Sequence, residues 1–139
     1  MLSVFLGTAT ANAQLFQDTS NLNLVKREID YIYNLQFDDT RRLYITISKR
    51  YPEHPIIFLL KGFKTYWENY PLLCATPAGV SFEEDMNQCI KFSEKDNNPD
   101  YATEYLLTNL CARGMLLLYF TENEQSMKVF PLTISTYRF

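Results

Sequence analysis

Few side chains in this sequence are of the types that catalyse reactions or bind transition metals. The only histidine, His54, stands between Glu53 and Pro55 in a corner bounded by prolines. The three cysteines are well separated along the chain: Cys74, Cys89 and Cys111. A zinc site or a Cys–His nucleophile requires several such groups at suitable spacings. We therefore interpret His54 as a turn residue and expect neither kind of site.

The odd number of cysteines, with no Cys-x-x-Cys pair, leaves two interpretations open. If the protein is exported, one disulfide and one free thiol can form, and the sequence does not select the pair. In the second interpretation, which we favour, the cysteines are buried and act as small apolar residues.

Carboxylates cluster at positions 38–39, 83–85 and 94–96, where acid–base chemistry or calcium binding can be considered. Two of these clusters stand at expected helix starts, where negative charge is favourable beside the helix dipole. The sequence has only four glycines, no glycine-rich phosphate loop, and neither a GxSxG nor an HExxH motif. We therefore expect a protein that is not an enzyme and that uses no cofactor or metal.

Composition is that of a globular domain, with 47% hydrophobic residues and 15% aromatic residues in 139 positions. The net charge is −3, and basic residues occur as isolated pairs such as Arg41-Arg42 and Lys49-Arg50. Binding to nucleic acid requires Lys and Arg clustered against phosphates, so this partner class is not expected. No segment approaches the roughly 20 apolar residues of a transmembrane helix.

The first thirteen residues resemble a secretory signal, because they are uncharged and end in Ala11-Asn12-Ala13. The pattern lacks a basic residue after Met1. We predict cleavage after Ala13 and a periplasmic protein, with a cytoplasmic location as the alternative if the segment is only a tail. The expected divisions are a signal-like segment at 1–13, a flexible lead-in at 14–21, and a helical domain at 22–139 that continues past Phe139.

The elements that must position these residues are helices, according to apolar spacing and boundary signals. We expect them at 22–35, 38–51, 55–70, 81–95 and 99–120. Ser81 is expected to cap the fourth helix after a loop at 72–80. The fifth is the most apolar and is expected to be the most buried. A sixth helix from about Glu124 is a weaker prediction because of Pro131.

The region from Phe37 to Trp67 carries a repeat-like spacing. Four residues follow one another at intervals of four, three and five: Thr40, Tyr44, Ile47 and Pro52. This pattern resembles the tetratricopeptide repeat, in which Gly62 takes the place of the close-packing glycine of the next unit. Thr40 and Ile47 are larger than the usual alanines, and Glu28 occupies the first unit's glycine position. The resemblance covers 22–67 well and 82–120 loosely.

This resemblance implies an all-α fold of antiparallel helical hairpins stacked as an array, as in secreted bacterial proteins with degenerate repeats. An irregular helical bundle is the alternative. The implied function is noncatalytic binding of a protein or peptide. Two alternatives remain: an accessory segment of a larger enzyme whose active site lies outside this chain, and a carrier of a small ligand or lipid beneath helix 99–120.

Aromatic residues of the third expected helix form the candidate interaction surface. They share one side of the helix: Phe63, Tyr66, Trp67 and Tyr70. Aromatic side chains are enriched in protein interfaces, and this set could line a concave groove. The other interpretation, which we favour, is that they pack against the second and fourth helices.

Overall fold

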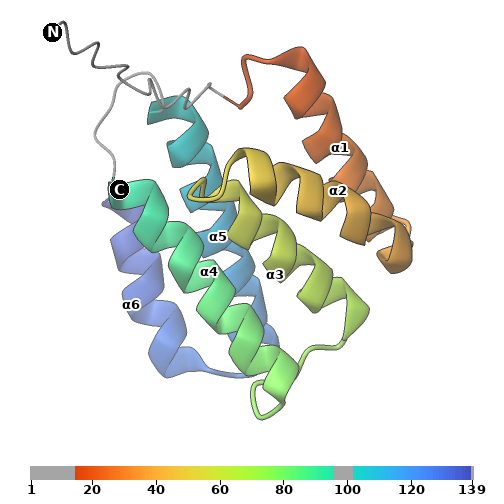
Figure 1. The fold of residues 1–139 in the computed structure, drawn as a ribbon. Coiled ribbons are helices and arrows are strands. Elements are labelled where there is room, and N and C mark those ends of the chain that lie inside the picture. Colours follow the sequence, from red (N-terminus) through yellow and green to blue (C-terminus); the bar gives the residue numbers. More distant parts are fainter. Residues whose placement is uncertain (1–14, 96–101, 139) are drawn as a thin grey trace, which may run out of the picture.

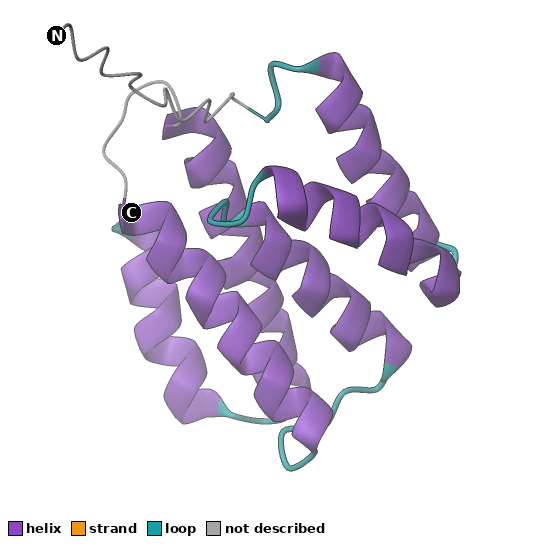
Figure 2. Ribbon diagram, viewed as in Figure 1, coloured by secondary structure: helices purple, strands orange, loops and turns teal. Residues whose placement is uncertain are grey.

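The computed structural model describes residues 15–95 and 102–138. In these residues the chain forms six helices and no strand (Figures 1 and 2). The helices are α1 (Thr19–Tyr33), α2 (Phe37–Arg50), α3 (Ile56–Glu68), α4 (Pro77–Lys95), α5 (Ala102–Glu122) and α6 (Ser126–Tyr137). The predicted all-α class is confirmed.

Each helix packs on its neighbour in the chain, and α3 also packs on both α1 and α5. Thus α3 contacts both α1 and α2, and α5 contacts both α3 and α4. In the described residues, the backbones of α2, α4 and α6 do not come close to one another. The hairpins α1–α2 and α5–α6 lie at opposite ends of the molecule (Figure 1). The arrangement is consistent with an array of hairpins in which each unit contacts the next.

Helix boundaries in the first half follow local signals. The Asp18 carboxylate accepts the backbone N–H of Ser20 at 2.8 Å, so α1 begins at Thr19 rather than at the expected Leu22. Leu35, with a φ of 58°, forms the tight turn to α2. Tyr51 ends α2 because the following Pro52 disfavours helical geometry there.

The predicted start of α4 at Ser81 was wrong. Helix α4 begins four residues earlier at Pro77, and the Thr76 hydroxyl accepts the Gly79 N–H at 3.1 Å. Proline suits a first helical position because its φ is preset and its missing N–H is not needed there. Residues 77–80, expected in a loop, therefore form the first turn of the helix.

Gly79 allows this turn to approach the preceding loop and α5. A Cβ at this position would overlap the Leu73 carbonyl oxygen and lie 2.7 Å from the Tyr119 hydroxyl. Gly62 of α3 is likewise buried, against the Met86 side chain of α4. Both glycines therefore stand at close contacts between elements, whereas a Cβ added at Gly114 of α5 would meet no atom within 4 Å.

The core lies where α3, α4 and α5 meet. Each of these helices contributes one aromatic ring: Tyr66, Phe82 and Tyr119. The ring centroid of Phe82 lies 5.6 Å from that of Tyr66 and 4.9 Å from that of Tyr119. The cysteines are free thiols, and burial raises the pKa of Cys89 to about 12, which leaves it unreactive at neutral pH.

Helix α6 extends through Pro131, the residue that weakened its prediction. Proline at this point removes one backbone donor, to which the carbonyl of Met127 would otherwise bond. Because Met127 is almost fully exposed, solvent can reach the carbonyl, and the cost to the helix is reduced.

Candidate interaction surface

Tyr66 of the aromatic set is a core residue. Only 1% of it is exposed, and its hydroxyl donates to Glu122 of α5 at 2.6 Å. Burial and this carboxylate raise the pKa of Tyr66 far above its ordinary value. Phe63 is half-buried against the core. These two side chains therefore pack inward, and a surface that includes Tyr66 is not accessible to a partner.

The other two aromatics stand at the edge between α1 and α3. Trp67 is half-buried, with its ring centroid 5.5 Å from that of Tyr33 and 5.7 Å from that of Tyr70. Tyr33 and Tyr70 are each 56% exposed. The structure thus reduces the predicted surface to a small aromatic edge.

Three of the four repeat-like positions face the interior, and the fourth lies in the corner after α2. Thr40 and Ile47 are buried, Tyr44 is half-buried, and Pro52 is exposed in the corner. Small or apolar residues at these places let the helices approach.

His54 does more than turn the chain. It is 7% exposed; its Nδ1 accepts the Ile56 N–H at 3.1 Å, and its Nε2 lies 3.1 Å from a Glu104 carboxylate oxygen. The same carboxylate accepts the backbone N–H groups of Leu15, at 3.1 Å, and Phe16, at 2.6 Å. Both ring nitrogens are therefore committed to structural bonds, with the proton placed on Nε2. Burial lowers the pKa of His54, opposed by its bond to Glu104.

This cluster places residues 15–21 of the predicted lead-in, whereas residue 14 and the predicted signal-like segment at 1–13 lie outside the described residues. Leu15 is completely buried, because Glu104 binds the backbone of this segment to the start of α5. Sequence reasoning missed Glu104, whose partners are separated from it by 88 and 89 positions and leave no local signal.

The apolar helix α5 faces the opposite way from the prediction. Its buried side carries polar residues in the first half, among them Glu104, Thr108, Asn109 and Arg113. Leu116 is buried in the core, but four other leucines of α5 are 41–51% exposed: Leu106, Leu107, Leu110 and Leu118. The expectation that α5 would be the most buried helix was based on composition. It failed because apolar and polar residues are distributed around α5 without the usual separation.

The polar side of α5 is satisfied by neighbouring helices. Arg113 donates to Asn109 at 2.7 Å, to Glu94 of α4 at 2.8 Å and to Ser135 of α6 at 2.8 Å. Asn109 in turn donates to Ser93 at 2.7 Å. Buried polar groups of this kind are tolerated when they are hydrogen-bonded, and here they hold three helices together.

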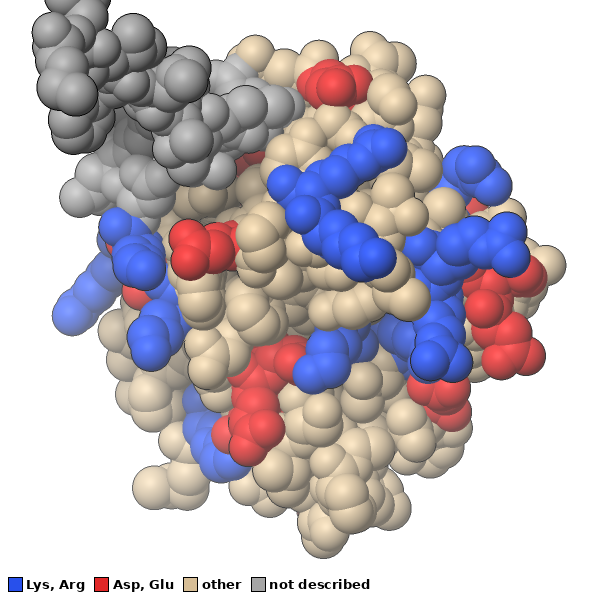
Figure 3. All heavy atoms as spheres, in the orientation of Figure 1, with Lys and Arg blue, Asp and Glu red and all other residues tan. Residues whose placement is uncertain are grey.

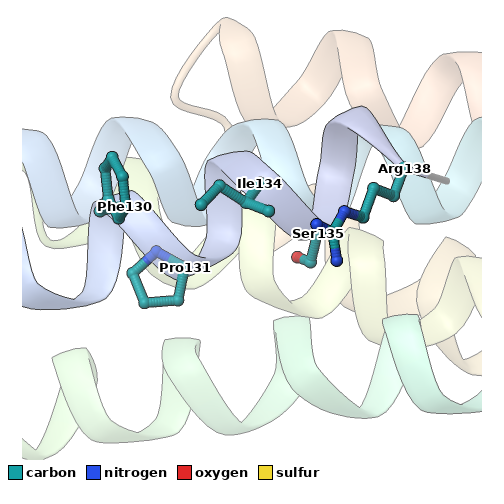
Figure 4. Close-up of a pocket in the computed structure, with 5 residues that line it drawn as sticks. All are labelled: Phe130, Pro131, Ile134, Ser135 and Arg138. Atoms are coloured by element: carbon teal, nitrogen blue, oxygen red, sulfur yellow. The ribbon is translucent and has the colours of Figure 1, made fainter.

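Helix α6 continues the apolar exterior of α5. None of its residues is buried, and several large apolar side chains are exposed: Met127, Phe130, Ile134 and Tyr137. A hollow of about 570 Å³ is lined by Phe130, Pro131, Ile134, Ser135 and Arg138, all projecting from α6 and its C-terminal end (Figure 4).

A second hollow, of about 350 Å³, runs between the end of α5 and the start of α6. Phe120 and Thr121 line it from α5, and Val129, Phe130 and Thr133 line it from α6. Phe130 therefore stands between two depressions. We call the exposed leucines of α5 together with Phe130 and Ile134 the α5–α6 face. Large apolar side chains exposed on two helices that pack together are typical of sites where proteins associate.

Two classes of site find no support in the described residues. No group of three or more His, Cys, Asp or Glu side chains there is arranged to hold a metal ion. The described helices also include none with the length and hydropathy needed to cross a membrane.

Comparison with family models, curated proteins and solved structures found no match to this chain. The tetratricopeptide resemblance therefore remains a prediction.

Proposed function

We propose that this chain is a noncatalytic, exported module of stacked helical hairpins that binds an amphipathic helix of another protein on the α5–α6 face. The observation that carries the proposal is the exposure of four leucines of α5 and of Phe130 and Ile134 on α6, the helix that packs against it. Leaving several large apolar side chains in water is unfavourable by roughly 25 cal/mol for each Å² that a partner could cover.

A helix is the occupant that suits the packing of the chain itself. Helix α3 lies against both α1 and α2, and α5 lies against both α3 and α4. No helix of the described segments lies in the corresponding way against α5 and α6. A partner helix with apolar residues at positions i, i+4 and i+7 would repeat this packing on the α5–α6 face.

The bonds of His54 and the raised pKa of Cys89 support a noncatalytic role. The imidazole nitrogens of His54 are committed to Ile56 and Glu104, and the Cys89 thiol has a pKa of about 12. Neither group is therefore available as a base or nucleophile at neutral pH.

The proposal is tested by selecting peptides from a displayed library against the wild-type protein. We expect selected sequences to carry apolar residues at helical spacing and to become helical on binding. Phe130→Asp should weaken binding by about 100-fold or more, because it places a charge at the residue that lines both hollows. Ile45→Asp, at a 42% exposed isoleucine of α2, is the matched control and should leave binding unchanged.

Two outcomes would contradict the proposal. Selected peptides that bind equally well to Phe130→Asp would place the interaction elsewhere. Concentration-dependent dimerisation in sedimentation experiments, abolished by Phe130→Asp, would assign the face to a second copy of the chain.

A further inference from the structure

A buried carboxylate without a partner lies on the other side of the molecule from α6, in the first hairpin. Glu28 of α1 is 1% exposed, and its Oε2 atom is buried with no hydrogen-bond partner. An unpaired polar atom in the interior is unfavourable because it has lost its bonds to water, and a charged one is more so. Such an atom in a folded protein calls for an explanation.

Glu28 lines a pocket of about 520 Å³ between the first three helices. The pocket wall contains apolar, aromatic and charged residues of α2 and α3: Phe37, Asp38, Thr40, Arg41, Tyr44, Leu60, Lys61, Lys64 and Glu68. Figure 3 shows that Lys and Arg side chains gather over α2 and α3, with Asp and Glu side chains among them. The volume is within the range of sites that bind small molecules or single side chains.

The two lysines of this pocket already have counterions. Lys64 Nζ lies 2.6 Å from Glu68 Oε2, and Lys61 Nζ lies 2.8 Å from Asp85 Oδ1 of α4. Burial raises the pKa of Glu28 to about 7, and the charge of Lys64 opposes this rise only in part. Glu28 is therefore the buried acidic group of the pocket without an ion pair in the described residues, whereas Asp38, which also lines the pocket, is exposed to solvent.

We propose that the pocket binds a primary ammonium group, with the Glu28 carboxylate as its counterion. An anionic ligand would place a second negative charge against Glu28, and an apolar ligand would leave Oε2 unpaired. An ammonium group supplies both a positive charge and donors for Oε2. The ammonium can come from a lysine side chain of a peptide or from a free small amine, and the test below distinguishes these sources.

Binding of this kind releases a proton from Glu28 and leaves the ammonium protonated. The charged or titratable groups that line the pocket with Glu28 come from α2 and α3: Asp38, Arg41, Tyr44, Lys61, Lys64 and Glu68. Asp85 of α4 is the counterion of Lys61. Since Glu28 must ionise to bind the ammonium, the affinity should fall about tenfold per pH unit below pH 7.

The probes are acetyl-Ala-Lys-Ala-amide and n-butylamine, titrated into isotopically labelled protein and followed by NMR. We expect both to shift the backbone amides of Glu28, Tyr44 and Lys61 in a saturable way. Two peptides serve as controls, one with acetylated lysine and one with glutamate in its place. Neither should shift these amides. A peptide that binds at least about tenfold more tightly than butylamine indicates a lysine side chain as the ligand.

Glu28→Gln keeps the side-chain shape and should weaken ammonium binding about tenfold or more, whereas Glu53→Gln, at an exposed corner residue, should not. Calorimetry of the wild type in two buffers of different ionisation enthalpy is a second test that needs no variant. It should report proton release near pH 6.5 and almost none at pH 8.5.

The proposal is overturned if neither amine produces a saturable shift, or if Glu28→Gln binds as the wild type does. It is also overturned if the glutamate peptide binds in preference. Because Phe130→Asp should leave ammonium binding intact, failure here is distinguishable from failure of the α5–α6 face.

Discussion

Glu28 should make the folded protein less stable as the solution becomes more basic. The pKa of this carboxyl is raised from 4.5 to about 7 in the folded state. Between these pH values the folded protein binds a proton that the unfolded chain has lost, so stability falls as pH rises through this interval. Above pH 7 both states are deprotonated and the loss is complete. A shift of this size corresponds to about 3 kcal/mol, since one pKa unit is worth ~1.4 kcal/mol.

Glu28→Gln removes the ionisation while keeping the shape of a protonated carboxyl. The variant should differ from the wild type by less than about 1 kcal/mol at pH 5 and be more stable by up to about 3 kcal/mol at pH 8.5. Urea denaturation at half-unit pH steps measures the difference, with Glu53→Gln as the exposed control. If the stability difference between Glu28→Gln and wild type is the same at pH 5 and pH 8.5, the assignment of this pH dependence to buried Glu28 is refuted.

Three further predictions follow from packing and charge. Gly79→Ala should destabilise the protein by at least ~1–3 kcal/mol, because the new methyl group meets the Leu73 carbonyl. Gly114→Ala has open space and should stabilise the protein by ~0.5–1 kcal/mol. Equal melting temperatures of the two variants would contradict this prediction. Gly62→Leu should cost ~1–3 kcal/mol through overlap with Met86, and an unchanged melting temperature would count against close contact there. Because the pKa of His54 is lowered in the folded protein, the unfolded chain binds more protons between pH 6.5 and 5. The stability of the wild type should therefore fall as the pH falls through this range, and His54→Gln should reduce that fall. Identical slopes in denaturation experiments would rule out His54 as the source of this pH dependence.

The positions of α2 and α3 could be read from the sequence because their signals are local. Tyr51-Pro52 ends one helix and Pro55 precedes the next, and the observed bounds differ from the predicted ones by no more than two residues. The start of α4 was not predicted because proline is common both in loops and in the first turn of a helix. Thr76-Pro77, which caps and begins α4, was therefore expected to lie in the loop at 72–80.

The orientation of α5 could not be predicted in the same way. Its apolar and polar residues are interleaved around the helix, so hydrophobic periodicity does not choose between the two faces. The choice is made by distant partners: Glu104 binds the backbone near Leu15, and Arg113 bonds to residues of α4 and α6. Distant partners also explain why Tyr66 does not belong to an exposed aromatic surface. It packs against Phe82 and donates a hydrogen bond to Glu122, and neither residue is near it in the sequence.

The absence of any buried residue in α6 has a consequence for the order in which the described helices open. Stability within a protein varies from segment to segment, and helices with little burial exchange their amide hydrogens through small local openings. Helix α6 is held by half-buried Val129 and Leu132, by the Arg113–Ser135 bond and by the ion pair of Lys128 with Glu83 of α4. It should therefore exchange faster than α3, although both are regular helices. A partner bound beside Phe130 would slow exchange throughout α6, and some of its binding energy would be used to hold this helix closed.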